Sequence, residues 1–438
     1  MANLLYTLDQ KPPFAKNVLY GIQWLLIVLP LVTVTSNLMA DFLHMDPVQS
    51  TALFQRFLLV VGAVTAGQCL FGHRYPLLDG PSAALLLSVA VIADQGIAVI
   101  SGGMIAGGVV LLLLGGLGLV GRLERLFTDR VVGVVLILIS TTLLPILYPM
   151  LIGKSETAPH GDPFILMIST LIMLAIILLS HWTKGYTRNL SVFLGITLGF
   201  AAMFVLGRVD LSGVFMLHWF AVPDPLLGPV PRFTFSGTLS FLLAYVAVLI
   251  NGLGSYLSVA EVVGKEGLES RVERGITLTG AGGILAAAFG VVGTVSYSLS
   301  PGVILVTGVG SRFPVFLCGL LLIAMAFFQK VGAVFSAIPD AVIAAALFVT
   351  LAAQMGIGIS VVAGSKWLMN VRDYLVVGLP LLLGTAASML PKSFLSLFPP
   401  SARALLGNGL IVGIVLVLLL EHVVLRERGT SPVGRVEK

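Results

Sequence analysis

Two short segments, far apart in the chain, interrupt apolar sequence with Gly, Pro and Ser. They cover residues 74–84, around Pro81, and residues 294–302, around Pro301. In each segment an extended stretch meets a proline placed where it could open a helix, because the ring presets the helical φ. A helix that begins inside a membrane presents free N–H groups and partial positive charge at its N-terminus. Both segments are therefore candidate binding elements for a polar or anionic small molecule.

The elements that must position these segments are membrane spans. Of the 438 residues, 57% are hydrophobic and only 10% are charged, whereas soluble proteins average about 25% charged residues. The chain is therefore expected to be an integral membrane protein that contacts lipid. Cys69 and Cys318 both lie in apolar runs, which excludes a disulfide scaffold and a cysteine metal site. We expect no metal and no cofactor.

The apolar stretches predict about fourteen transmembrane segments, each of roughly 20 residues. The first segment follows Lys11 and Lys16 and lacks a small-residue cleavage site, so it is interpreted as a retained span rather than a signal peptide. The predicted spans are 17–39, 50–71, 76–93, 97–120, 130–151, 163–182, 189–207, 236–263, 275–293, 297–311, 314–335, 338–359, 371–390 and 404–425.

The basic residues predict the orientation of these spans. With the N-terminus placed inside, 18 of the 25 Lys and Arg residues fall on the inner side and six on the outer side. Basic residues are enriched in cytoplasmic loops, so both termini are predicted to be cytoplasmic. Residues 426–438 are interpreted as a solvated tail. No eukaryotic targeting signal is visible, and a prokaryotic inner membrane is the assumed location.

The two interrupted segments are the third and tenth of the fourteen spans, which divides the chain into seven plus seven. An odd number of spans per half turns the second half upside down, which gives an inverted repeat. Non-helical backbone is tolerated at membrane depth only when it is buried in protein or lines a cavity. A pair of such breaks in corresponding positions indicates a transporter binding site. Residues 129–135 and 339–345, which open the fifth and twelfth spans, repeat the same seven-span offset.

Nearly the whole chain resembles the nucleobase/ascorbate transporter family, also called the uracil–xanthine permease family. The first span begins with Lys11-Pro12-Pro13 and carries Gln23-Trp24, where a Gln-His pair is usual in that family. The eighth span carries residues 251–255, and the tenth carries residues 299–308, which overlie the family's signature motif. Ile338-Pro339 resembles the entry to its twelfth helix.

The resemblance implies a fold of two intertwined halves. Spans one to four and eight to eleven would form a transporting core, over residues 15–121 and 236–335. Spans five to seven and twelve to fourteen would form a gate, over residues 122–235 and 336–425, which commonly mediates homodimerisation. Members import uracil, xanthine, uric acid or related compounds, often with protons, by an elevator-like movement of core against gate. We thus expect a small-molecule substrate, with a proton or sodium ion as a possible co-substrate, and no nucleic-acid partner.

The chain departs from the family's pattern at the site. The acids that usually grip the substrate on the eighth and tenth helices are Asn251 and Leu299 here, and the motif Asn is Ser300. An Asn side chain offers donors and an acceptor, so Asn251 could pair with a neutral base. Loss of two negative charges also favours an anion held by serines and helix ends. An exchanger of small organic or inorganic anions therefore stays open as the alternative.

The predicted substrate-binding residues come from spans one, three, eight and ten: Gln23, Trp24, Gly80, Ser82, Asn251, Ser255, Tyr297, Ser298, Leu299 and Ser300.

Two carboxylates are candidates for ion coupling. Asp79 either couples transport, since an ionisable group inside a span is functional by default, or caps the third half-helix. Glu261 lies ten residues after Asn251, roughly 15 Å along a helix. This distance favours a structural or gating role for Glu261. Trp24 either stacks on a planar ring or fills the core.

A catalytic function is not expected. The six histidines lie mostly at span ends or in loops, and no HExxH, GxSxG or phosphate-binding Gly-Lys-Ser motif occurs. A channel would need a continuous polar pore lining, which the apolar spans do not supply. The sequence thus predicts a secondary transporter and not an enzyme.

Overall fold

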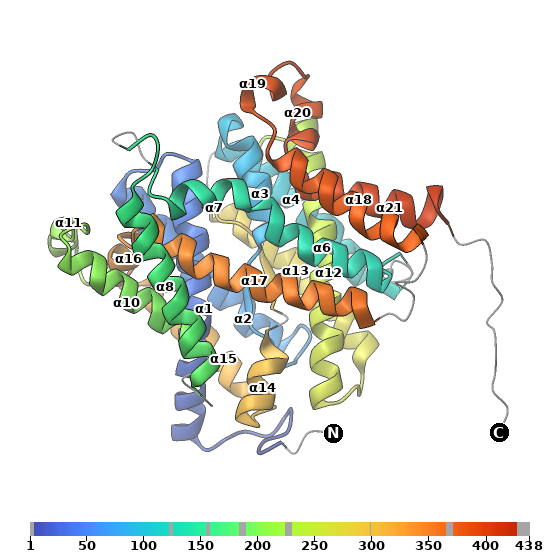
Figure 1. The fold of residues 1–438 in the computed structure, drawn as a ribbon. Helices are drawn as coiled ribbons and strands as arrows, with labels where there is room; N and C mark the ends of the chain where they lie inside the picture. Colours follow the sequence, from blue (N-terminus) through green and yellow to red (C-terminus); the bar gives the residue numbers. More distant parts are fainter. Residues whose placement is uncertain are drawn as a thin grey trace.

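The computed structural model describes residues 4–121, 126–154, 158–183, 190–223, 230–297, 299–364 and 371–426, and the fold is almost entirely helical (Figure 1). The first half contains α1 (Phe14–Phe42), α2 (Pro47–Leu70), β1 (Asp79–Pro81), α3 (Ala83–Ile92), the short helix η1 (Ala93–Gln95), α4 (Ile97–Gly116), α6 (Asp129–Thr142), α7 (Leu144–Leu151), α8 (Pro163–Trp182), α10 (Ser191–Val205) and α11 (Ser212–Met216).

The second half contains α12 (Phe235–Val263), α13 (Leu268–Ala288), β2 (Thr294–Ser296), α14 (Ser300–Thr307), α15 (Phe313–Ala326), α16 (Gln329–Ser336), α17 (Asp340–Gly364), α18 (Val371–Ser388), α19 (Lys392–Leu395), α20 (Pro400–Leu406), α21 (Gly409–Leu419) and the π-helical turn η2 (Leu420–Val424). Each predicted span overlaps one of these elements or a run of them, and the fifth, eleventh and fourteenth each cover more than one helix.

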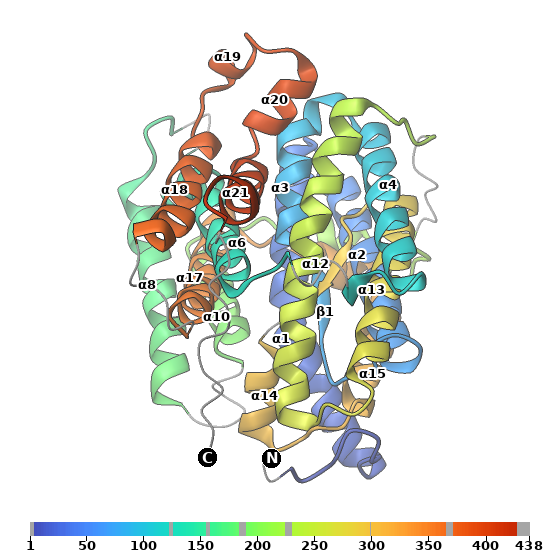
Figure 2. The same cartoon turned by 90° about the vertical axis from the view of Figure 1, so that its right-hand side faces the viewer.

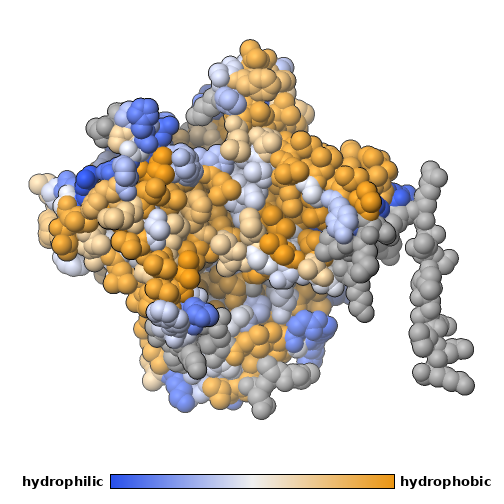
Figure 3. Space-filling model, in the orientation of Figure 1, coloured by the Kyte–Doolittle hydropathy of each residue, from blue (hydrophilic) through white to orange (hydrophobic). Residues whose placement is uncertain are grey.

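The helices have the length and surface of membrane spans. Within the described residues, eight helices are long and apolar enough to cross a membrane, and shorter apolar helices stand beside them. Only 28% of the most apolar stretch of α8, and the same share of α18, is buried inside the protein. Figure 3 shows hydrophobic residues covering much of the face on which α8, α17 and α18 lie. Lipid is the environment that such a surface fits, which supports the polytopic membrane class.

The two interrupted segments meet at the centre of the fold. β1 and β2 form a two-stranded antiparallel sheet, in which Asp79 pairs with Ser296 and Pro81 with Thr294. The half-helices α3 and α14 leave this sheet in opposite directions (Figure 2). The predicted broken segments are thus confirmed, and each satisfies its extended backbone by pairing with the other, as burial at membrane depth requires.

The start of the first half-helix differs from the prediction. Pro81 lies in β1 and does not open the helix; α3 begins at Ala83, and the Ser82 hydroxyl accepts a hydrogen bond from the Leu85 N–H. A serine N-cap satisfies one of the free N–H groups, so this cap replaces the expected proline start. Pro301 does lie in the first turn of α14, as predicted.

The helices pack in two groups. α1 to α4 pack with α12 to α15, and α6, α8 and α10 pack with α17, α18 and α21. The groups stand side by side, with the strands inside the first group (Figure 2). α1 and α12 also contact α17, α6 and α21, so these two helices form the boundary between the groups.

Paired glycines set the closest helix approaches. A Cβ on Gly62 of α2 would lie 2.6 Å from the Gly319 oxygen of α15, and a Cβ on Gly108 of α4 would lie 2.8 Å from the Gly280 oxygen of α13. Small residues let backbones approach closely in membrane bundles. An offset of seven spans exchanges these two contacts, because it relates α2 to α13 and α4 to α15. The packing therefore follows the inverted repeat.

Candidate substrate-binding site

A small cavity lies where the half-helices begin, at the boundary between the two helix groups. Its volume is about 160 Å³, below the roughly 300–1,000 Å³ of pockets for drug-sized ligands, so it suits a small molecule. Its walls come from both groups: Leu31, Thr35, Pro81, Ser82, Ala83, Ala84, Ala247, Val248, Asn251, Val295, Tyr297 and Leu299 from the first, and Ile139, Leu347, Thr350, Leu351, Ala353, Gln354 and Ile357 from the second.

Two side-chain amides in this wall have buried atoms that no hydrogen-bond partner among the described residues satisfies. On α12 the Asn251 Oδ1 atom is an acceptor without a partner. On α17 the Gln354 Nε2 atom is a donor without a partner. Orientation of an amide is assigned from its hydrogen bonds, so either amide can present N–H or C=O to a ligand. Leaving such buried groups unpaired costs about 1–3 kcal/mol each. A polar ligand between them would remove that cost.

Tyr297 lines the small cavity beside the amides, whereas Gly80, a predicted binding residue, does not line it and instead contacts the Tyr297 ring. The Tyr297 hydroxyl donates to the Pro81 oxygen at 3.0 Å. A Cβ on Gly80 would lie 2.4 Å from the Tyr297 ring, so only glycine lets the ring approach β1 this closely. The Tyr297 ring is therefore held against β1, and its hydroxyl already has a hydrogen-bond partner.

Ser255 and Ser300 act in the frame of the site. The Ser255 hydroxyl lies 2.8 Å from the backbone oxygen of Ser296 and 2.8 Å from the backbone oxygen of Asn251. The Ser300 hydroxyl accepts a hydrogen bond from the Leu78 N–H at 3.1 Å. Neither lines the cavity, and their hydroxyls tie α12 and α14 to the two strands.

Gln23 and Trp24 do not line the cavity either. α1 contributes Leu31 and Thr35 instead, and Gln23 lies eight residues before Leu31, about 12 Å along a helix. Trp24 is 3% exposed and belongs to the hydrophobic core. The structure thus places Trp24 as a core-filling residue.

The two coupling candidates have opposite surroundings. Glu261 is 66% exposed and pairs with Lys265, which lies two residues beyond the end of α12, remote from the cavity. Asp79 is completely buried, and its Oδ1 accepts a hydrogen bond from the Ser296 hydroxyl at 2.7 Å. Of the two roles left open for Asp79, capping of α3 is wrong, because Ser82 caps this helix. Ser298, a further predicted binding residue, lies outside the described residues.

Thr35, Thr350 and Gln354 were not among the predicted binding residues, and neither was His73. The sequence feature that could have identified Gln354 as a binding residue is its position as a lone amide in an apolar helix. His73 follows α2 in the sequence, yet it is completely buried and its Nε2 lies 3.5 Å from Asp79 Oδ2. The fold of residues 71–78 back into the protein, which no local pattern predicts, brings it there.

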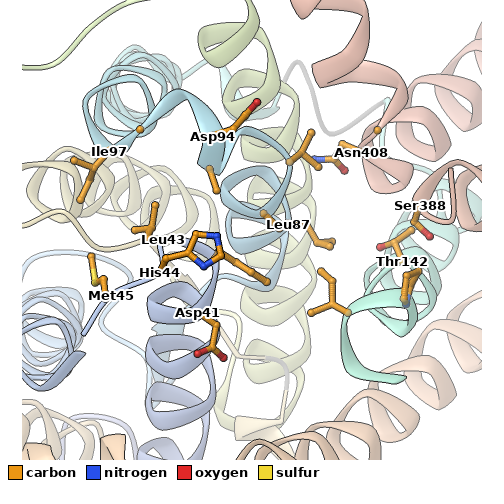
Figure 4. A pocket seen from close by; sticks show the side chains of 18 of the residues that line it. Asp41, Leu43, His44, Met45, Leu87, Asp94, Ile97, Thr142, Ser388 and Asn408 are labelled. Carbon is orange, nitrogen blue, oxygen red and sulfur yellow. The ribbon is translucent and has the colours of Figure 1, made fainter. Parts of the chain in front are cut away.

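A second, larger cavity of about 1,050 Å³ lies nearby (Figure 4). Asp41 and His44 at the end of α1, Asp94 beyond α3, and Asn408 before α21 line it. The Asn408 amide donates to the Ser88 hydroxyl of α3 at 3.2 Å. This larger cavity and the smaller one both reach α3, about one helical turn apart.

No group of three or more His, Cys, Asp or Glu side chains suited to a metal ion occurs in the part of the chain that the structure describes.

Solved structures share this fold. The chain is similar to the transmembrane domain of a cyanobacterial bicarbonate transporter, BicA, with a TM-score of 0.63 and 13% identity over 92% of this chain and 96% of that one. It is also similar to the murine anion transporter Slc26a9, with a TM-score of 0.62 and 11% identity over 94% and 69% of the two chains. The chain therefore shares the 7+7 inverted-repeat fold of these two proteins.

Sequence comparison gives the family. The model described as "Permease family", named for xanthine and uracil permeases, matches residues 15–393. The chain belongs to this family, the nucleobase/ascorbate transporters, and it is a permease rather than an enzyme.

Individual relatives are similar over most of their length. The uric acid transporter UacT of Escherichia coli is 26% identical, covering 92% of this chain and 85% of that protein. The uric acid permease PucJ of Bacillus subtilis is 27% identical, covering 83% and 82%. The xanthine permease of the same organism is 24% identical, covering 94% and 94%.

Proposed function

We propose that this protein is a secondary active transporter of a nucleobase-like small molecule of the uracil, xanthine or purine class. The observation that carries the proposal is the small cavity with Asn251 on one helix group and Gln354 on the other, both with buried unpaired atoms. The ring of a base carries N–H and C=O groups along its edge, which match two amides. The relatives named for uric acid and xanthine support the same class.

Asn251 stands where typical members carry a glutamate. Its amide can donate one hydrogen bond and accept another, which is the pattern that a lactam edge of a base requires. The flat ring of Tyr297 and the apolar side chains of Leu299 and Leu351 enclose the ring faces. Recognition in this proposal needs no ionised group in contact with the substrate.

We propose that transport occurs by movement of a core against a gate. The core comprises residues 15–121 and 236–335, and the gate residues 122–235 and 336–425. Both line the small cavity, so a sliding core would carry Asn251 away from Gln354 and release the substrate. Alternating access in inverted-repeat transporters is largely such a rigid-body movement about the site.

The larger cavity is proposed as the outer vestibule. It lies at the ends of α1 and α3 that are remote from the N-terminus (Figures 1 and 4), and the distribution of basic residues places both termini in the cytoplasm. We assign the protein to a prokaryotic inner membrane. We also propose a homodimer through the apolar outer faces of the gate helices α8 and α18.

Asp79 is the proposed binding point of a co-transported proton or sodium ion. It is completely buried, and it lies three residues from Ser82 in the cavity wall. Glu261 is exposed at the far end of α12 and makes no contact with the cavity. Gradient-driven uptake that persists unchanged in Asp79→Asn would exclude this assignment.

Binding to the purified protein tests the proposed function. Xanthine, uracil, hypoxanthine or adenine should raise the melting temperature, because a ligand of the folded state stabilises it, and bicarbonate, sulfate and fumarate should not. Asn251→Ala should weaken binding about tenfold, the effect of one lost hydrogen bond of about 1.4 kcal/mol.

Ser258→Ala is the matched control, since Ser258 lies on the same helix, is exposed, and bonds only within α12. Stabilisation by anions alone would refute the proposed substrate class. Equal affinity in Asn251→Ala and Ser258→Ala would refute the site.

A further inference from the structure

The small cavity contains two threonines that come from different helix groups. Thr35 lies on α1 in the first group, and Thr350 lies on α17 in the second. A planar ring that fills so small a cavity contacts residues of both groups. Within the described residues no charged side chain lines this cavity, so neutral hydrogen-bonding groups must distinguish one base from another.

Both threonine hydroxyls can only accept a hydrogen bond from a ligand. A hydroxyl has one hydrogen and two lone pairs. The Thr35 hydroxyl donates its hydrogen to the Leu31 oxygen at 2.8 Å, and the Thr350 hydroxyl donates to the Ala346 oxygen at 2.9 Å. Such a bond to the carbonyl four residues earlier is common for threonine in a helix. Each threonine oxygen is therefore left with acceptor capacity alone.

The amides beside the threonines do not impose the same restriction. Gln354 lies one turn after Thr350 on α17, and Asn251 lies on α12. Either amide can be turned to donate or to accept, so the two amides fit more than one kind of base edge. The threonines cannot adapt in this way without losing their bonds within the helix. They are therefore the groups that can select among bases.

The start of α3 supplies donors to the same cavity. Ala83 and Ala84, the first two residues of α3, line it. The first N–H groups of a helix have no partner within the helix, and the Ser82 cap satisfies only that of Leu85. The wall thus offers donors for a carbonyl oxygen and, from the threonines, acceptors for N–H groups. A ureide edge, in which a carbonyl lies between two ring N–H groups, has the complementary pattern.

We propose that Thr35 and Thr350 accept hydrogen bonds from ring N–H groups of the base and make the site prefer bases with a ureide edge. This inference rests on the proposed nucleobase function and deepens it. Xanthine, uracil and uric acid carry such an edge, whereas hypoxanthine and adenine present a bare ring nitrogen in its place. A bare nitrogen would set its lone pair against a threonine lone pair and leave both acceptors without a donor.

Two matched pairs of bases measure this preference. Xanthine and hypoxanthine share the purine ring, but hypoxanthine lacks the C2 carbonyl and the N3–H of xanthine. Uracil and pyrimidin-4-one differ in the same way and serve if the site prefers pyrimidines. Equilibrium dissociation constants are measured on the purified full-length protein at mildly acidic pH, at which all four bases are neutral.

The wild type should bind the ureide member of the pair that it accepts at least about tenfold more tightly than the other member, the effect of one hydrogen bond. Thr35→Val and Thr350→Val remove the acceptors and nearly keep the side-chain shape. The ratio should fall about tenfold in the double variant and in the single variant whose threonine faces the N–H that the second base lacks. Thr35→Ser and Thr350→Ser are the controls, because they keep the hydroxyl, and their ratios should stay close to that of the wild type.

The outcomes separate the two claims. A wild type that binds none of the four bases refutes the proposed function. A wild type that binds both members of a pair equally overturns the inference alone, and this test needs no variant to fold. A double valine variant that melts cooperatively and keeps the wild-type ratio also overturns it. So do serine variants that lose the ratio as the valine variants do, because the base would then contact the methyl groups and not the hydroxyls.

Discussion

At the scale of single residues, the small cavity takes one amide from each group of helices, Asn251 from α12 and Gln354 from α17. Ser82, Asn251, Tyr297 and Leu299 were predicted from the broken segments and the family motif, and they line the small cavity. Gln354 was not, because an isolated amide in an apolar helix carries no sign of the direction in which it points. The site spans two groups of helices, and the residues of the second group are brought to it only by tertiary packing.

Gln354 is predicted to contribute to affinity. Replacing it with alanine removes the donor that faces the small cavity, so the dissociation constant for the best base should rise about tenfold, equivalent to about 1.4 kcal/mol. Isothermal titration of the purified variant measures this. Ser360→Ala serves as the control, because Ser360 is exposed on the same helix and bonds only to the Gly356 oxygen. An unchanged affinity in Gln354→Ala would show that this residue of the gate does not bind the substrate.

At the scale of elements, hydropathy predicted the spans and the broken segments, but not the way the breaks are joined. The antiparallel pairing of Asp79 with Ser296 joins residues more than 200 positions apart. Nothing in either segment alone specifies that register. Pro81 was placed at the start of a helix from its ring geometry, yet the ladder with Thr294 holds it in β1. The pairing between the two segments therefore determines that Pro81 is in a strand and not in a helix.

The glycine contacts between helices give a stability prediction. Gly62→Val would place a Cβ 2.6 Å from the Gly319 oxygen, so α2 and α15 must separate. Overpacking of this kind costs about 1–3 kcal/mol, and the melting temperature in detergent should fall clearly. Gly378→Val is the control, because a new Cβ at this position of α18 meets nothing within 4 Å. Its melting temperature should stay close to that of the wild type. Equal melting temperatures for the two variants would show that close glycine packing does not hold the bundle together.

At the scale of the whole molecule, the proposed transport mechanism requires two bodies that move past each other. α1 and α12 meet α6, α17 and α21 at the boundary, and both the small cavity and the hydrogen bond from Asn408 to Ser88 lie there. The span pattern and the two broken segments predicted the inverted repeat, and the family resemblance implied the division into core and gate. They could not predict which side chains touch across the boundary, because that depends on the position of the core relative to the gate.

Cross-linking across this boundary tests whether the core moves past the gate during transport. In Ser88→Cys/Asn408→Cys the new thiols replace side chains 3.2 Å apart on the core and the gate. In the control, Thr141→Cys/Thr385→Cys, they replace hydroxyls 2.9 Å apart, both within the gate. Native Cys69 and Cys318 are completely buried, and the wild type measures their background.

The measurement is uptake of a radiolabelled base into proteoliposomes, before and after oxidation and again after reduction. We predict that oxidation stops uptake in Ser88→Cys/Asn408→Cys, that reduction restores it, and that the cross-linked gate pair still transports. If the fully cross-linked Ser88→Cys/Asn408→Cys protein takes up the base as fast as the same protein with its thiols reduced, the core does not carry its substrate past the gate.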